Sequence, residues 1–254
     1  MLSRTILPAI ARLLTFFLPP STWYRAALPI SGIFAHALRL RGSTGLKPHR
    51  FEQAILLNRM LAFLTRARRP FPVPWRMDAE AREALDDAAA SRGGVVLCSG
   101  HLPLIKVGVR AFMESGHTPT AVIAAEPGPD GQIPIWGLAE RMPTLKAQPD
   151  VLLRTRTVLR RGGSILLLVD TIAGDYSPNI FRLAKATGAA VLFFTAELEG
   201  DGCVEVRVFQ VPYPGCRDQA EIAGNLRALD RQIKRISGKP QDGPFDTVPA
   251  VRLT

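Results

Sequence analysis

The first 77 residues of this chain contain almost no acidic side chains. They hold a single acid, Glu52, against 12 lysine and arginine residues, whereas residues 78–254 hold 21 acids and 20 of these cations. The first segment therefore has a formal charge of +11 and the second a charge of −1. A basic segment on a nearly neutral body indicates an anionic partner, either phospholipid head groups or nucleic acid.

Cysteine is also scarce. The three cysteines, Cys98, Cys203 and Cys216, are widely spaced, form no Cys-x-x-Cys pair and lack the histidines that would complete a zinc site. This pattern excludes a disulfide framework, lacks the spacing of a zinc site and indicates a reducing compartment. We predict no metal and no cofactor. Because Cys98 lies within a predicted strand, we interpret it as a small buried side chain and not as a nucleophile.

Long apolar runs are absent as well. A membrane-spanning helix needs about 20 apolar residues, but residues 5–18 are interrupted by Arg12 and residues 26–40 by Pro29, Gly32 and His36. Neither segment is expected to cross a membrane. Arg12 and the lack of an Ala-x-Ala cleavage site also argue against a signal peptide, so we expect this N-terminal segment to be retained.

Residues 5–18 are amphipathic when they are wound as a helix. Arg4, Arg12 and Thr15 fall opposite an apolar arc made of Ile6, Leu7, Ile10, Leu13, Leu14, Phe17 and Leu18. This pattern is typical of a helix that lies in a membrane interface, although ordinary core helices show it too, and both interpretations stay open. Nucleic acid is not expected as a partner, because the basic residues alternate with apolar ones and no recognition module is visible.

We predict two parts: a basic, amphipathic, membrane-associated helical arm over residues 1–77 and an α/β domain over residues 78–254. The arm includes a helix at 51–69, ended by Pro70, Pro72 and Pro74. In the body, helices are expected at 78–91, 103–116, 149–161, 178–187 and 218–237, and strands at 94–99, 119–125, 164–169, 190–196 and 203–211. Continuous apolar runs in the strands predict a mostly parallel central sheet covered by helices on both faces. The last strand alternates in polarity, which predicts a half-exposed edge.

Ionisable residues follow the predicted parallel strands, whose carboxyl ends meet at one edge of the sheet. They are His101, Glu126, Asp170 and Glu197. Ligands of open α/β sheets bind at this edge, so His101 is a candidate general base. Five residues later comes Lys106. If Pro103 begins the next helix, Lys106 lies in or beside the first turn, with its side chain directed back toward His101.

Three stretches of the body resemble a known family in order and spacing. Residues 94–101 are Gly-Val-Val-Leu-Cys-Ser-Gly-His, residues 159–170 are Leu-Arg-Arg-Gly-Gly-Ser-Ile-Leu-Leu-Leu-Val-Asp, and residues 183–194 are Leu-Ala-Lys-Ala-Thr-Gly-Ala-Ala-Val-Leu-Phe-Phe. They resemble the lysophospholipid acyltransferase superfamily, most closely its lipid A lauroyl/myristoyl acyltransferase branch. The resemblance covers roughly residues 90–212.

The resemblance implies an α/β body with a membrane-associated N-terminal segment. It also implies transfer of a fatty acyl chain from an acyl carrier protein or coenzyme A thioester to a lipid hydroxyl, and our hypothesis for this chain allows a hydroxyl or an amine as the acceptor. The expected partners are therefore the thioester donor, a lipid acceptor and an anionic membrane surface. The expected location is the cytoplasmic face of the bacterial inner membrane, with peripheral or interfacial anchoring.

The family signature is a histidine followed by four residues and then Asp or Glu. His101 matches the histidine that acts as the base, but Lys106 stands where the carboxylate belongs. A cation there opposes both the helix dipole and an imidazolium. Where the family usually has a basic residue before a proline, this chain has Glu126. Our hypothesis is that Glu126 pairs with Lys106 or replaces the missing partner of His101.

A further departure is the short loop between Asp170 and Phe181, where the family usually has a longer one. Lipid A is therefore not implied as the acceptor. We predict catalytic roles for His101, Glu126 and Lys106, and substrate binding by Asp170 and Arg156.

Several alternatives stay open. Lys106 is either a solvated lysine or a group that grips a carrier-protein phosphate or a lipid head group, and Asp170 either binds substrate or caps a turn. For the whole protein, the first hypothesis is an acyltransferase with His101 as general base. The second is a catalytically retired homologue that binds lipid or a protein partner without turnover.

Overall fold

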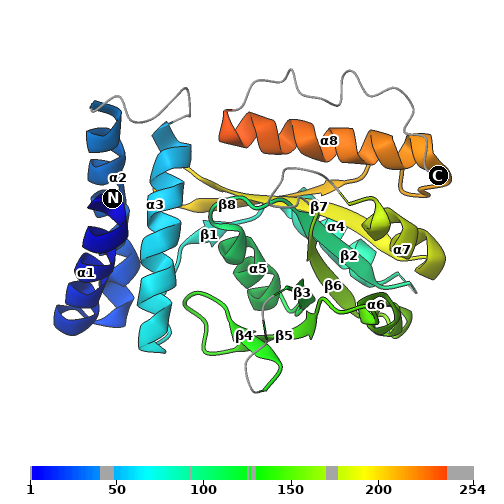
Figure 1. The fold of residues 1–254 in the computed structure, drawn as a ribbon, viewed down its shortest axis with the longest axis horizontal. Coiled ribbons are helices and arrows are strands. Elements are labelled where there is room, and N and C mark those ends of the chain that lie inside the picture. Colours follow the sequence, from blue (N-terminus) through cyan, green and yellow to red (C-terminus); the bar gives the residue numbers. More distant parts are fainter. Residues whose placement is uncertain are drawn as a thin grey trace.

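The N-terminal part of the chain is helical. A computed structural model describes residues 2–40, 49–91, 93–124, 126, 130–169 and 177–238. The first helices are α1 (Leu2–Phe17), α2 (Trp23–Leu40) and α3 (His49–Leu64), with short 3-10 turns at Pro20–Thr22 and Thr65–Ala67. They lie side by side at one end of the molecule (Figure 1).

The body alternates between strands and helices, as the apolar runs predict. Its helices are α4 (Ala79–Ala89), α5 (Ile105–Glu114), α6 (Val151–Arg160), α7 (Asn179–Thr187) and α8 (Gln219–Ser237). Its strands are β1 (Trp75–Arg76), β2 (Val95–Ser99), β3 (Thr120–Ile123), β4 (Gln132–Pro134), β5 (Arg141–Lys146), β6 (Ser164–Leu168), β7 (Ala190–Leu198) and β8 (Val204–Gln210).

In the described part of the chain these strands form one sheet in the order β1-β8-β7-β2-β6-β3-β5-β4. The pairs β4–β5 and β7–β8 are antiparallel and all the others are parallel. The predicted α/β class and mostly parallel sheet are thus confirmed. Strand β8 is covered by β1 at only two positions, so it is the last long strand on its side of the sheet.

Side chains of each central strand alternate between two apolar layers. Val96 and Cys98 of β2 face a layer that contains residues of α6, α7 and α8, whereas Val95 and Leu97 face one that contains residues of α4 and α5. In Figure 1, α8 lies along one face of the sheet and α5 lies on the other. Because helices cover both faces, the strands are continuously apolar.

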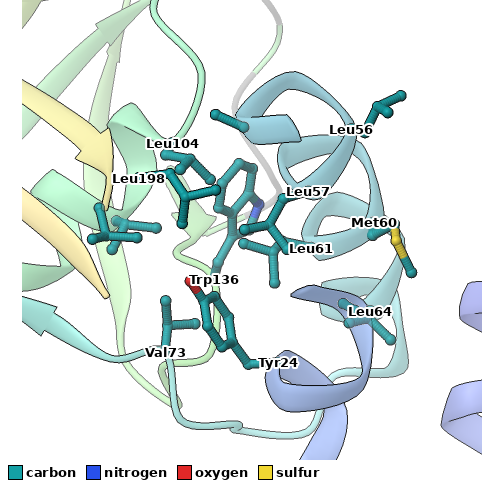
Figure 2. Close-up of a cluster of buried hydrophobic side chains, with 14 of the residues drawn as sticks. Tyr24, Leu56, Leu57, Met60, Leu61, Leu64, Val73, Leu104, Trp136 and Leu198 are labelled. Carbon is teal, nitrogen blue, oxygen red and sulfur yellow. The ribbon is translucent and has the colours of Figure 1, made fainter. Parts of the chain in front are cut away.

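A third apolar cluster joins the N-terminal helices to the body. It contains residues of α1, α2 and α3 together with Leu104, Trp136 and Leu198. Figure 2 shows Trp136 among Leu57 and Leu61 of α3 and Leu104 of the body. The buried Tyr24 hydroxyl of α2 also donates a hydrogen bond to the Gly202 carbonyl (2.7 Å). The N-terminal helices therefore share a core with the sheet.

The apolar side chains of α1, those of the predicted arc together with Ala11 and Phe16, are divided between this core and the surface. Leu7 and Ala11 are fully buried, and Ile10, Leu14 and Leu18 pack against the same cluster. By contrast, Leu13, Phe16 and Phe17 are 56%, 82% and 71% exposed. Among the described helices, none is long and apolar enough to cross a membrane.

Three strands were not predicted from the sequence. Strand β1 lies just before residue 78, so residues assigned to the arm contribute to the sheet of the body. Strands β4 and β5 lie in a stretch, residues 126–148, for which we predicted no element. Both contain proline and lack an apolar run, because β4 is Gln-Ile-Pro and β5 is Arg-Met-Pro-Thr-Leu-Lys.

Candidate active site

His101 lies at the carboxyl edge of the sheet because it follows strand β2. β2 pairs with β7 on one side and β6 on the other. At its end the Ser99 hydroxyl donates to the Phe194 carbonyl (2.7 Å), and the Ser99 carbonyl accepts from the Val169 N–H (2.9 Å). The chain thus leaves the sheet from a fixed point, and His101, two residues on, is exposed.

The loop after His101 is held by helix α3. Leu104 adopts a left-handed backbone conformation (φ 63°), which costs a residue with a side chain about 1–3 kcal/mol. Its side chain is fully buried in the cluster shared with α3, and its N–H donates to the Asn58 Oδ1 atom (3.3 Å). Helix α5 accordingly begins at Ile105, not at Pro103 as predicted. Lys106 therefore lies in its first turn.

Replacing Asn58 with alanine should lower the free energy of unfolding by about 1 kcal/mol, because the Leu104 N–H loses its acceptor in a half-buried position. Urea denaturation measures the change. Asn179→Ala, an exposed asparagine at the start of α7, is the matched control. Equal stability of the two variants would contradict a role of Asn58 in holding the loop.

The Lys106 side chain contacts Trp136. Its Nζ atom lies 5.3 Å from the centre of the Trp136 ring, a cation–π distance. Desolvation at this contact lowers the pKa of Lys106 from its ordinary value, although part of the residue stays exposed. The predicted direction of the Lys106 side chain toward His101 stays a prediction.

Glu126 forms an ion pair with Lys146, the last residue of β5. The register of β3 and β5 places Lys146 opposite Ile123, and Glu126 comes shortly after Ile123. Neither the Glu126–Lys106 pair nor a Glu126–His101 hydrogen bond is formed among these described residues. The expected pairing was wrong, because Glu126 pairs instead with a cation of the unpredicted strand β5.

The structure adds little on the other predicted site residues. Arg156 lies on α6, half-buried, and its Nε atom is buried without a hydrogen-bond partner in the described part of the chain. Asp170 lies outside the described residues. Glu197, in β7, is held by Arg235 (2.7 Å) and Arg207 (3.6 Å). The roles predicted for His101, Glu126, Lys106, Asp170 and Arg156 therefore stay predictions.

Two residues that organise this region were missed from the sequence. Arg110 of α5 donates to the carbonyls of Phe71 (2.8 Å) and Trp136 (3.3 Å), and so ties the segment around Trp136 to the chain that leads into β1. Gly137 lies against the same contact, since a Cβ atom there would be 2.1 Å from the Phe71 carbonyl oxygen. Arg110 and Gly137 belong to no spacing motif, so no signal in the sequence indicated these contacts.

The arrangement places an exposed imidazole at the carboxyl edge of the parallel strands, the edge at which open α/β sheets bind ligands, in a loop that contacts α3. No group of three His, Cys, Asp or Glu side chains is placed to hold a metal ion within the described ranges. No protein-family model matches this chain, and no curated protein matches it significantly.

Proposed function

We propose that this protein is a membrane-associated acyltransferase that moves a fatty acyl chain from a carrier thioester to a lipid hydroxyl or amine, with His101 as general base. One observation carries the proposal. His101 is exposed immediately after the central strand β2, at the edge where open α/β sheets bind ligands. The buried Leu104 and the Asn58 hydrogen bond hold the loop that follows it.

The proposed reaction needs two successive transfers of one proton, first to His101 and then to the leaving group. The imidazole of His101 takes the proton of the acceptor hydroxyl or amine while the acceptor atom attacks the thioester carbonyl. The bond between carbon and sulfur then breaks, and the thiolate leaves with the proton that His101 carries. An ester or amide and a free thiol are the products, and no oxidant, metal or cofactor is consumed.

The exposed apolar surface of α1 supports a lipid acceptor. Leu13, Phe16 and Phe17 share one side of the helix and stay exposed, whereas Leu7 is buried and Ile10, Leu14 and Leu18 are partly buried against the core. The surrounding segment is strongly cationic, and its single acid, Glu52, is already paired with Arg39 (3.1 Å). Apolar side chains beside unneutralised cations suit an interface with anionic phospholipids, such as the cytoplasmic face of the bacterial inner membrane.

The proposal predicts acyl transfer by the full-length chain reconstituted in vesicles that contain phosphatidylglycerol. Radiolabelled acyl carrier protein and coenzyme A thioesters are offered in turn with a bacterial lipid extract, and labelled lipid and free thiol are measured. Vesicles without the extract control for simple thioester hydrolysis. Labelled lipid should form in step with free thiol. Vesicle binding without transfer from either donor would contradict the proposal and favour the retired homologue.

A further inference from the structure

A strongly basic cavity of about 820 Å³ lies beside the first turn of α5. One wall is the end of α3 and the turn that follows it, and the opposite wall is Lys106 together with residues 130–141. The volume is in the range of small-molecule sites. Its cations come from three separate elements and are Arg66, Arg68, Arg69, Lys106 and Arg141.

Most of these cations have no carboxylate partner. Arg141 pairs with Asp130, the single acid in the cavity wall. Arg66 lies over the Phe63 ring (4.6 Å) and Lys106 over the Trp136 ring. Within the described part of the chain, no ion pair involves Arg66, Arg68, Arg69 or Lys106. Four unneutralised charges around one concavity create a site for a multiply charged anion.

The walls of the cavity are preformed. Trp136 is buried, and its carbonyl accepts from Arg110 on the side away from solvent. On the opposite wall, Arg68 ends its 3-10 turn in a left-handed conformation (φ 55°), with its N–H bonded to the Thr65 carbonyl (3.0 Å). The backbone of both walls is therefore held in place before a ligand enters, which lowers the cost of ordering on binding.

We propose that this cavity binds a ligand that carries at least two phosphate groups close together. A carboxylate would neutralise only one of the four free charges, whereas a diphosphate offers about three charges in a compact space. Guanidinium groups also match phosphate oxygens with paired hydrogen bonds. The proposal does not depend on acyl transfer, because it is built on the cavity and its charges alone.

Isothermal titration of the full-length chain in uncharged detergent with inorganic pyrophosphate tests the site. Lys106→Glu should weaken binding at least 100-fold and Arg69→Ala about tenfold, because each removes a charge-assisted contact. Arg25→Ala is the matched control, since Arg25 is an exposed arginine of the same basic segment outside the cavity, and its affinity should equal that of the unsubstituted protein. Succinate should bind at least tenfold more weakly than pyrophosphate.

Two results would overturn the proposal. One is the absence of pyrophosphate binding, and the other is binding weakened equally by Arg25→Ala and Arg69→Ala, which would reveal nonspecific attraction to the basic segment.

A competition experiment identifies the source of the phosphates. Vesicles that contain a lipid with a diphosphate head group should displace pyrophosphate if the ligand is a lipid head group, with phosphatidylglycerol vesicles of equal charge as the comparison. If pyrophosphate binding depends on Lys106 and Arg69 and neither kind of vesicle displaces pyrophosphate, the ligand is a soluble one. Neither result requires the protein to be an acyltransferase.

Discussion

Replacing His101 with alanine is expected to lower the rate of acyl transfer by a factor of about 10²–10⁴, the usual contribution of a general base. The loss should be in the catalytic rate and not in stability. His101 is exposed and lies in a loop whose conformation is set by the neighbouring Leu104. The free energy of unfolding should therefore change by about 1 kcal/mol or less. Initial rates of labelled-lipid formation measure the effect.

His117→Ala is the matched control for that experiment. His117 lies just beyond the other end of α5, where its Nε2 atom contacts the Asp86 carboxylate (2.7 Å). Its loss should leave the rate within about twofold of the unsubstituted protein, since it takes no part in the proposed proton transfer. Equal rates for His101→Ala and the unsubstituted protein would remove His101 from the mechanism and would leave the proposed activity without a base.

Replacing Arg110 with methionine should destabilise the protein by about 2–4 kcal/mol. Arg110 is only 7% exposed. Its guanidinium donates to the carbonyls of Phe71 and Trp136 and to the Glu114 carboxylate (2.8 Å). Methionine preserves the length of the side chain but leaves these acceptors without their donor. The expected loss of stability is not larger, because the Glu114 carboxylate is partly exposed and can be hydrated when its partner is removed.

Urea denaturation compares Arg110→Met with Arg82→Met, an exposed arginine of α4 whose loss should cost about 0.5 kcal/mol or less. Pyrophosphate binding provides a second readout. Because Arg110 holds the carbonyl of Trp136, its loss should also loosen one wall of the basic cavity and weaken binding. Equal unfolding midpoints for the two variants would show that the buried guanidinium contributes nothing to the fold.

The alternation of helices and strands in the body could be predicted because apolar runs and turn residues are local signals. Strand β2 was expected at 94–99 and lies at Val95–Ser99, and strand β6 was expected at 164–169 and lies at Ser164–Leu168. Strands β4 and β5 gave no such signal. They are stabilised by pairing with each other and with β3, which depends on residues distant in the chain.

The candidate site was predictable in part for the same reason. The position of His101 follows from the strand that precedes it, so the sequence places it at the sheet edge. The partners of Lys106 and Glu126 do not follow from local spacing. Lys106 contacts Trp136, 30 residues away in the chain, and Glu126 contacts Lys146 on a strand that the sequence did not reveal.

The sequence by itself determined the order of the helices and of the longer apolar strands of the body, the apolar arc of the first helix and the uneven distribution of charge. Only the tertiary structure decided which apolar side chains are buried and which charged side chains lie together, because both depend on packing between segments that are distant in the sequence. It buries Leu7 and Ala11 but leaves Phe16 and Phe17 exposed. It also gathers the end of α3, the start of α5 and residues 130–141 around one cavity. Proximity of this kind arises from long-range contacts, which no local pattern of residues encodes.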